Sequence, residues 1–546
     1  MAEYTDQELL FLSNLMHMKK EVVYDENGKR NLIPFDNVWN ESKVGTTIGN
    51  IISSINTASL RKEPLKDHEF DGIISGSEWA DMIDAMKTSS ICELKLQDVN
   101  RDDKNSLITS FTDKEGKAYV VFRGTSSGEW EDNFLGGCTS DTDQQKRALD
   151  YINSLKADHI TVVGHSKGGN KAKYVALLSD KVDRCVSFDG QGFSQDFIDT
   201  YRDKIIANKH KITCYALDND FVNILLYDVF NKKYYIKGNG VDTFPENHSP
   251  NSFFHYTYKD GKIGVYFEKG SQGECMAKLH SFVNYISSTI PDKDREPLFS
   301  LLGGMAAKML GEGASTDDLL KYLSDKKNSD ELGLLAAYII EYEEYDEGIS
   351  DAIFYILDKS GHPYIAKWLR KLEDRIGLEN LLKFVFKYEK QIDEILKKFK
   401  VPEDIRNLLK NMAEGYERRK NDVKDVTKES IKDYDVYGGN NVRDYSQEKR
   451  DVLLKLTDKV ANEKPYDVTK WDVWYRFEDW FGLLDIDHYK NDIDKYYEKV
   501  IDINGTSHRQ MVQIFDEVDR VVMDYKKTMR EETNKLNALS NKVLWL

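Results

Sequence analysis

The chain has 546 residues, of which 40% are hydrophobic, and its formal net charge is −17. This length exceeds what one hydrophobic core supports, so two or three domains are expected. The acidic excess argues against sequence-independent binding to nucleic acid and against permanent docking on anionic lipid headgroups, since both need a basic surface. The longest apolar run, residues 332–340, is far short of a membrane-spanning helix of roughly 20 residues.

The N-terminus begins MAEYTDQELL and lacks the basic region of a cleaved signal peptide. The five cysteines are scattered, odd in number and without a C-x-x-C pair, so neither a disulfide framework nor a zinc site is expected. Cys185 and Cys214 fall in apolar runs and are expected to be buried strand thiols. These features predict folding in a reducing compartment, and no metal or other cofactor is expected.

Strand-like runs rich in Val, Ile, Tyr and Phe occur in the first half of the chain. They are residues 106–112, 118–122, 160–163, 184–188, 212–216 and 262–267. Helical patterns alternate with several of them, for example at 143–155 and 170–178. This alternation predicts a mainly parallel sheet covered by helices on both faces, preceded by a hairpin formed by the first two runs.

From about residue 270 onward, apolar residues recur at helical spacing in long charged stretches. The sequence DVYGGNNVRDYSQ, residues 435–447, has the paired Gly and Asn of a linker. We therefore predict an α/β domain over 1–275, a helical middle region over 276–434 and a helical domain over 435–546. The second half is expected to be all-α, with long helical hairpins.

The stretch TVVGHSKGGNKAKYVALL, residues 161–178, contains a G-x-S-x-G motif centred on Ser166. Such a motif arises by chance in roughly one chain of this length in five. Here it joins a predicted strand to a predicted helix, as a nucleophile elbow requires. The sharp turn needs small residues beside the serine, and Gly164 and Gly168 meet that need. The pattern predicts that Ser166 is a nucleophile.

A serine nucleophile needs a base to take its proton and a carboxylate to orient that base. In hydrolases with this elbow the acid and then the histidine follow the serine along the chain. The candidate acids follow two later strands and are Asp189, Asp218 and Asp220. The candidate bases lie before the next strand and are His248 and His255. His165, directly before the serine, is expected to point away from the reaction and to be structural.

Acyl transfer also needs hydrogen-bond donors for the developing oxyanion. One predicted donor is the backbone N–H of Lys167, the residue after the nucleophile. The second is Thr125, through its N–H and its hydroxyl, in the loop after the strand in AYVVFRGTSSGEW. The stretch NFLGGCTSD, residues 133–141, follows this loop, and its glycines suit either a hinged lid or a simple surface loop.

Residues 106–260 resemble the class 3, or fungal-type, lipase family, in particular its bacterial branch with a Gly-His-Ser-Lys-Gly-Gly-Asn elbow. Four matches carry the resemblance: Phe122-Arg123-Gly124-Thr125 with Trp130, the elbow at 164–169, Asn219-Asp220-Phe221-Val222, and His248-Ser249-Pro250-Asn251-Ser252-Phe253. The stretch at 187–192 is a looser match, because the family's proline is missing. The resemblance implies an α/β-hydrolase fold for the N-terminal domain.

The resemblance also implies roles for the site residues. Ser166 would be the nucleophile, His248 the general base and acid with His255 as its substitute, and Asp220, rather than Asp218 or Asp189, the orienting carboxylate. Thr125 and Lys167 would form the oxyanion hole. The implied activity is ester hydrolysis on lipids, of the lipase or phospholipase A type. The alternatives are an intracellular esterase or thioesterase with a helical oligomerisation domain, and a catalytically inactive hydrolase-fold binding scaffold.

The helical domain over 435–546 contains three tryptophans in WDVWYRFEDWFG, the last in a W-x-G motif at 480–482. Such a cluster is often core, but with its flanking helices it resembles LXG and WxG proteins of Gram-positive type VII secretion. Joined to a lipase-like domain, it is similar to secreted lipase toxins with reversed domain order. The resemblance implies export without a cleaved signal peptide, small helical WxG-like partners and an immunity protein at the lipase domain. The alternative location is the cytoplasm.

Overall fold

The computed structural model describes residues 4–430 apart from 64–73, 126–128, 240–243, 260–261, 311–315, 360–362, 364–365, 368–369, 371–376, 399 and 428–429. The chain divides into two compact units, Met1–Tyr437 and Gly438–Leu546. All described residues belong to the first unit. The expected linker at 435–447 and the expected LXG-like domain at 435–546 lie outside the described residues.

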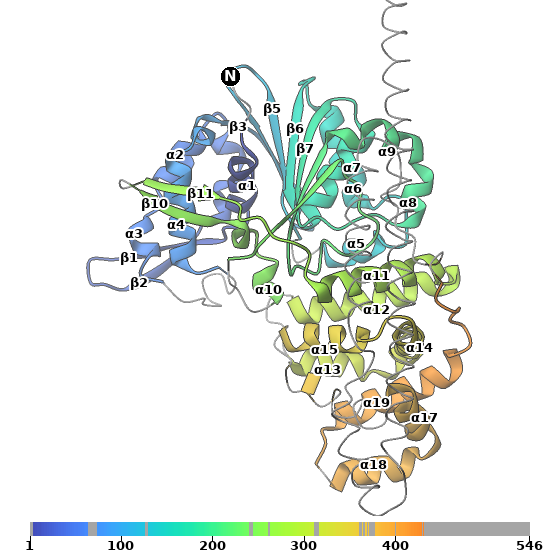
Figure 1. The fold of residues 1–546 in the computed structure, drawn as a ribbon. Helices are drawn as coiled ribbons and strands as arrows, with labels where there is room; N and C mark the ends of the chain where they lie inside the picture. Colours follow the sequence, from blue (N-terminus) through green and yellow to red (C-terminus); the bar gives the residue numbers. More distant parts are fainter. Residues whose placement is uncertain are drawn as a thin grey trace, which may run out of the picture. The chain divides into compact units, whose positions relative to one another are not determined.

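A seven-stranded sheet forms the centre of the first part of the chain (Figure 1). Its strands, in sheet order, are β3 (Lys95–Arg101), β4 (Leu107–Thr112), β5 (Ala118–Phe122), β6 (Ile160–His165), β7 (Val182–Phe188), β8 (Ile212–Leu217) and β9 (Lys232–Ile236). The strands from β5 to β9 are parallel, whereas β3, β4 and β5 pair antiparallel. The sheet is therefore mainly parallel, with an antiparallel hairpin leading into it.

Helices cover both faces of this sheet. Consecutive residues of a strand point to opposite faces, and the central strands β5 and β6 are buried throughout, so both faces need a cover. Val121 and Val163 pack into a core with α1 (Asp6–Leu15) and α4 (Gly76–Lys87). Val120 and Val162 pack into a second core with α6 (Asp143–Ser154) and α7 (Lys167–Leu178). Figure 1 shows α1 on one side of the sheet and α6 and α7 on the other. The shorter helices of this part are α2 (Ile48–Ser53), α3 (Thr57–Leu60), α5 (Trp130–Leu135), α8 (Gln195–Thr200), α9 (Arg202–Asn208) and α10 (Phe244–Asn247).

Two small antiparallel hairpins lie outside the main sheet. They are β1 (Lys20–Tyr24) with β2 (Arg30–Pro34), and β10 (His255–Lys259) with β11 (Lys262–Tyr266). The run at 262–267, expected in the main sheet, instead forms β11. Ile263 and Val265 pack against the same core as α4, so this strand buries its apolar face without joining the sheet.

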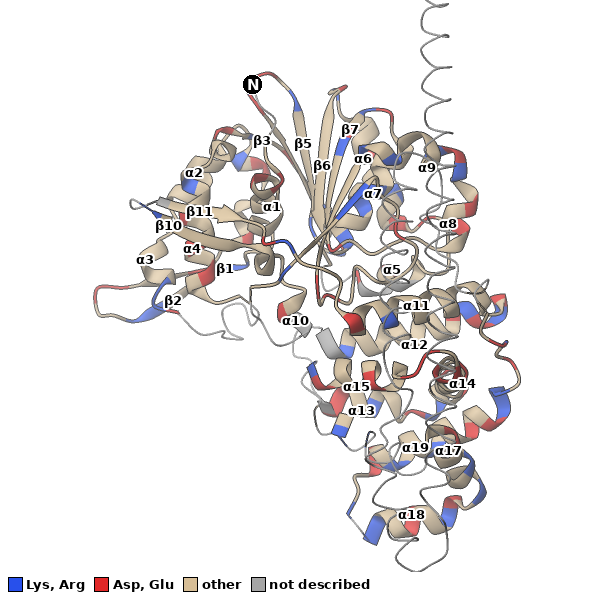
Figure 2. Ribbon diagram, in the orientation of Figure 1, with Lys and Arg blue, Asp and Glu red and all other residues tan. Residues whose placement is uncertain are grey.

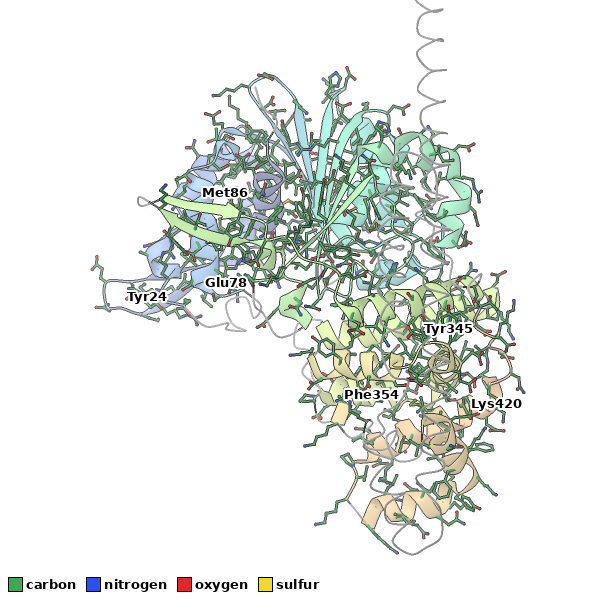
Figure 3. All side chains as sticks on the ribbon, in the orientation of Figure 1. Tyr24, Glu78, Met86, Tyr345, Phe354 and Lys420 are labelled. Atoms are coloured by element: carbon green, nitrogen blue, oxygen red, sulfur yellow. The ribbon has the colours of Figure 1, made fainter. Side chains whose placement is uncertain are left out.

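The region after β11 is helical, as expected. Its helices are α11 (Glu274–Thr289), α12 (Asp292–Leu310), α13 (Thr316–Leu323), α14 (Ser329–Tyr345), α15 (Ile349–Lys359), α17 (Leu378–Lys387), α18 (Glu389–Lys398) and α19 (Glu403–Arg419). They enclose separate cores, one of which contains Phe354, whereas Met86 belongs to the core beside the sheet (Figure 3). Helices α14 and α19 cross with Gly333 against Gly415, where a Cβ would overlap the opposite backbone. None of the described helices has the length and apolarity needed to cross a bilayer.

Candidate active site

Ser166 occupies a sharp turn between β6 and α7 at the carboxyl edge of the sheet. Its φ of 59° and ψ of −126° are unfavourable for a residue with a side chain, and such strain is typical of a nucleophile elbow. The turn depends on its glycines, because a Cβ at Gly168 would overlap the Phe122 carbonyl and one at Gly164 would overlap Gly168. The serine N–H donates to the Phe188 carbonyl at 2.9 Å, which holds the turn against β7.

The side chains of Ser166, His248 and Asp220 form one hydrogen-bonded chain. Asp220 Oδ1 accepts from His248 Nδ1 at 2.8 Å, which leaves Nε2 to accept from Ser166 Oγ at 2.8 Å. The Asp220 carboxylate is buried, and its Oδ2 accepts from the backbone N–H groups of Val222 (3.1 Å) and Asn223 (2.9 Å). The carboxylate is thus held rigidly, and it selects the imidazole tautomer that can take a proton from the serine.

The structure places two of the alternative candidates elsewhere. His255 lies on β10, with Nε2 2.8 Å from the Lys237 carbonyl and Nδ1 3.5 Å from Glu268. Asp218 Oδ1 accepts from the backbone N–H of Asn219 at 3.1 Å and of Gly238 at 3.2 Å. These contacts stabilise the loops around β8 and β9 and do not connect either side chain to the serine.

Asp189, the third candidate acid, is buried directly behind Asp220. Its Oδ1 accepts from Leu217 N at 2.8 Å and from Asn223 Nδ2 at 3.0 Å, and the same amide group lies 3.2 Å from Asp220 Oδ2. Burial raises the pKa of Asp189 well above its usual value, and the nearby Asp220 carboxylate raises it further. The two carboxyl groups thus disfavour double ionisation, and Asp189 is the one whose neutral form burial favours.

Two further histidines lie beside the His248 imidazole. The His165 ring centroid is 4.6 Å from that of His248 and 5.8 Å from that of His17. Loss of solvent lowers the pKa of both, to about 3 for His17 and well below the usual range for His165. Both are neutral at physiological pH. The sequence did not predict His17, which follows the end of α1 and is far from the elbow in the chain.

Donor atoms of His165, Asp189 and His248 lie within 4.8 Å of one another, and in the described part of the chain they are the one such group of potential metal ligands. Both nitrogens of His248 are already engaged, by Asp220 and Ser166. The raised pKa of Asp189 also opposes metal coordination, which requires an ionised carboxylate. The group does not fit a metal ion while the hydrogen-bonded chain is intact.

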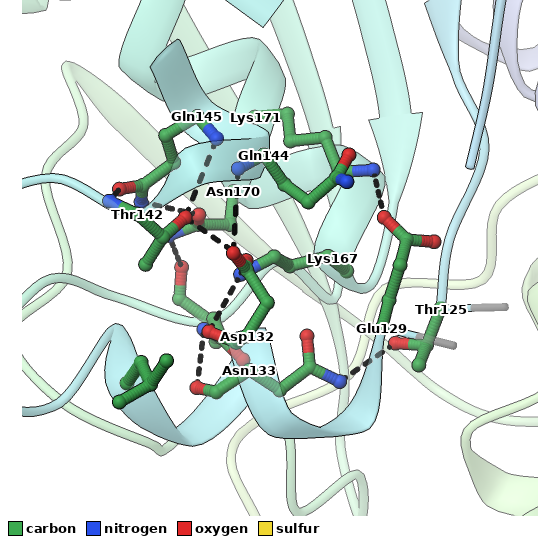
Figure 4. A network of polar contacts seen from close by, with 12 residues as sticks. Thr125, Glu129, Asp132, Asn133, Thr142, Gln144, Gln145, Lys167, Asn170 and Lys171 are labelled. Carbon is green, nitrogen blue, oxygen red and sulfur yellow. Dashed lines mark hydrogen bonds and ion pairs between the residues drawn. The ribbon is translucent and has the colours of Figure 1, made fainter. Parts of the chain in front are cut away.

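The two predicted oxyanion donors leave neighbouring strands at the same edge of the sheet. Strands β5 and β6 are adjacent, with Phe122 opposite Gly164, so Thr125 and Lys167 follow them into the same region. Lys167 is the first residue of α7, and the first N–H groups of a helix have no partner within it. Thr125 Oγ1 accepts from Asn133 Nδ2 at 2.9 Å (Figure 4), so its own hydroxyl proton is available to a substrate oxygen.

Two buried ion pairs join the segment after Thr125 to α7 (Figure 4). Lys167 Nζ lies 2.5 Å from Asp132, and Lys171 Nζ lies 2.5 Å from Glu129. All four side chains are at most 5% exposed. Buried charges of this kind persist only when paired, so the pairs hold α5 firmly against α7. The pairs fix Glu129 and Asp132, which directly precede the stretch at 133–141.

The sequence did not predict these ion pairs, although it contains all four residues. The pattern around the elbow does not predict that these lysines are buried, whereas the structure buries both. One signal in the sequence could have indicated the pairs. Lys167 and Lys171 are four residues apart at the start of a helix that follows a buried strand, and a lysine buried there requires a carboxylate partner. The partners themselves could not be identified from spacing.

An apolar side chain joins the site to the helical region. The ring of Phe221 lies 5.7 Å from that of His248 and packs on the core formed by α11 to α15. Ile224 belongs to the same core, and its carbonyl lies 2.8 Å from Nδ1 of His280 on α11. The helical region thus supplies an apolar boundary next to the His248 imidazole. Ser166 itself is 8% exposed.

The fold and site together define an α/β architecture with a serine, a histidine and an aspartate in hydrogen-bonded sequence at the carboxyl edge of a parallel sheet. The family described as Mbeg1-like matches residues 96–300, the part that contains these three residues. None of the curated proteins matches the chain. The crystal structure of M37 lipase is similar over 41% of this chain and 70% of that chain, with 15% identity and a TM-score of 0.23. A likeness of this size supports no conclusion about fold or activity.

Proposed function

We propose that the protein is a serine-dependent carboxylic ester hydrolase that acts on lipids, of the lipase or phospholipase A type. The observation that carries the proposal is the hydrogen-bonded chain from Ser166 through His248 to Asp220, with 2.8 Å at each link. A strained serine, a base on its hydroxyl and a buried carboxylate on that base are the parts of acyl transfer by a nucleophilic hydroxyl.

The proposed reaction has two halves. In the first, His248 Nε2 takes the Ser166 proton as Oγ attacks the ester carbonyl, and Asp220 stabilises the imidazolium. The N–H of Lys167 and the hydroxyl of Thr125 donate to the oxyanion, and His248 then protonates the departing alcohol. In the second, His248 takes a proton from water, the hydroxide attacks the acyl-enzyme, and the carboxylic acid leaves as Ser166 regains its proton.

A lipid substrate is supported by two features. Phe221 and the apolar core behind it border the imidazole, which suits an acyl chain better than a polar substituent. The sequence motifs around Thr125, Ser166, Asp220 and His248 also resemble those of class 3 lipases, which act on lipid esters. The proposed chemistry needs no cofactor, because side chains supply the nucleophile and base, and a backbone N–H and a hydroxyl supply the oxyanion donors.

The test compares wild type with Ser166→Ala on a water-soluble short-chain ester and on dispersed phospholipid. We expect the variant to lose turnover and labelling by a fluorophosphonate probe. Ser179→Ala, at the end of α7, is the matched control and should retain both. Equal turnover and labelling in wild type and Ser166→Ala would refute the hydrolase. Turnover of the soluble ester without phospholipid would favour an intracellular esterase or thioesterase, and no turnover at all a binding scaffold.

We further propose that residues 435–546 direct the protein to a type VII secretion route, as an antibacterial or virulence effector. The support is the resemblance of this stretch to LXG and WxG proteins, together with a lipase-like domain that precedes it. Small helical WxG-like proteins would bind the C-terminal domain, and an immunity protein would bind the hydrolase domain in the producing cell. Co-expression with small helical proteins encoded nearby tests the proposal. A full chain that binds none of them would favour the cytoplasmic alternative.

A further inference from the structure

The corner between α17 and α18, residues 383–390, has an unusual surface. Its sequence is KFVFKYEK, and six of its eight residues are exposed: Lys383, Phe384, Phe386, Lys387, Tyr388 and Lys390. Every exposed residue is thus either aromatic or a lysine. The aromatic side chains are 52%, 47% and 38% exposed in chain order. Among the phenylalanines whose exposure the structure describes, Phe384 and Phe386 are the two that are exposed.

The aromatic rings of the corner lie at its surface and are not buried in the helical core. Val385 is buried between the two phenylalanines, so α17 is anchored while Phe384 and Phe386 flank the anchored face. The Phe384 and Tyr388 rings lie 5.1 Å apart, and the Lys387 ammonium lies 5.2 Å from the Tyr388 ring. Exposing a contiguous apolar surface to water is unfavourable in free energy, and such a patch commonly marks a site where a partner binds.

The charge of the corner is opposite to that of the chain. Its one carboxylate, Glu389, is held by Lys410 at 2.5 Å, and Lys383 pairs with Glu379 at 2.6 Å. The corner has three lysines and one glutamate, so it carries net positive charge in a chain whose net charge is −17. Two further exposed lysines, Lys397 and Lys398, lie in the last turn of α18, and this helix also carries carboxylates, so both charge colours appear along it (Figure 2). The corner therefore attracts anionic partners that the rest of the chain repels.

Aromatic rings and lysines together are the composition of protein surfaces at a membrane–water interface. The rings enter the headgroup level, and lysines reach the phosphates while their stems stay apolar. A second copy docked through the same corner is a poorer partner, because a two-fold contact would bring the lysines together. We propose that the corner at 383–390 docks the protein on anionic phospholipid membranes and so brings the hydrolase to its substrate, an inference that rests on the proposed lipid hydrolysis.

Vesicle sedimentation with the full chain tests the docking surface. The chain carries Ser166→Ala so that the bilayer stays intact, and the vesicles contain phosphatidylcholine with or without phosphatidylglycerol. We expect binding to the anionic vesicles, weakened at least about tenfold by Phe384→Ser with Phe386→Ser and, separately, by Lys387→Glu with Lys390→Glu. Tyr258→Ser is the matched control, since Tyr258 is 66% exposed on β10, and it should bind like the parent chain.

Activity measurements on the same substitutions, with Ser166 intact, separate this proposal from the hydrolase itself. We expect unchanged turnover of a water-soluble ester and about tenfold lower turnover of phospholipid in anionic vesicles. Corner variants that bind vesicles as tightly as the parent chain would overturn the proposal. So would variants that alter only the oligomeric state, since the corner would then join copies of the chain. If the wild-type chain did not hydrolyse the ester, the proposed hydrolase activity would be refuted, whereas the sedimentation result on membrane docking would stand.

Discussion

Replacing Asp189 by asparagine should increase the free energy of unfolding relative to wild type, and this gain should grow as the pH rises. Burial and the Asp220 carboxylate raise the pKa of Asp189 well above its unfolded value of about 3.9, so the folded protein holds a proton that the unfolded chain releases. The proton stabilises the folded state fully below the unfolded pKa, and that contribution is lost as pH rises towards the folded pKa. The loss is about 1.4 kcal/mol per pH unit.

Asparagine mimics the protonated acid without the titration. Its Oδ1 can accept from Leu217 N and Asn223 Nδ2 as before, its amide replaces the carboxyl proton, and it tolerates the φ of 44° at this position. Over the pH range in which the folded protein keeps this proton, the variant should therefore gain stability relative to wild type as the pH rises.

Urea unfolding of both proteins at pH 5, 6 and 7 measures this difference. Other groups titrate alike in the two proteins, so the difference in unfolding free energy isolates position 189. Asp189→Ala is a useful control, because it removes the acceptor for Leu217 N and should destabilise the protein at every pH. A difference between Asp189→Asn and wild type that does not change with pH would mean that Asp189 is ionised in the folded protein.

Three other substitutions test the site. Lys171→Met leaves the buried Glu129 without its lysine and should lower the free energy of unfolding, measured by calorimetry, by about 3–5 kcal/mol. Lys114→Met, which breaks an exposed pair, should lower it by less than about 1 kcal/mol, and equal losses would contradict the role of burial. Asp220→Asn should lower kcat on a soluble ester about 10⁴-fold without unfolding, and a near-normal kcat would exclude it as the orienting acid. Asn133→Ala should lower kcat about tenfold with KM unchanged, through the proposed oxyanion hydroxyl; an effect on KM alone would contradict this role.

Much of the secondary structure was predictable from local patterns. The interior strands β5 to β8 are short apolar runs bounded by polar turns, and the structure has strands at each of them. The edge strands β3 and β9 were missed, because the sequences KLQDVNR and KKYYI carry the polar residues that exposed edges tolerate. The run that became β11 was recognised as a strand, but its partner was not, since an apolar face can be buried against a helix as well as in a sheet.

The sequence by itself named Ser166 through the elbow and left three acids and two histidines as its candidate partners. The resemblance to class 3 lipases selected Asp220 and His248 among them. Only the tertiary structure decided that these three side chains meet at 2.8 Å. It also decided that Asp189 is buried behind Asp220, that His17 adjoins the site, and that lysines of α7 are buried against carboxylates. The physical reason is that burial and pairing depend on groups far apart in the chain, whose approach leaves no pattern in neighbouring residues.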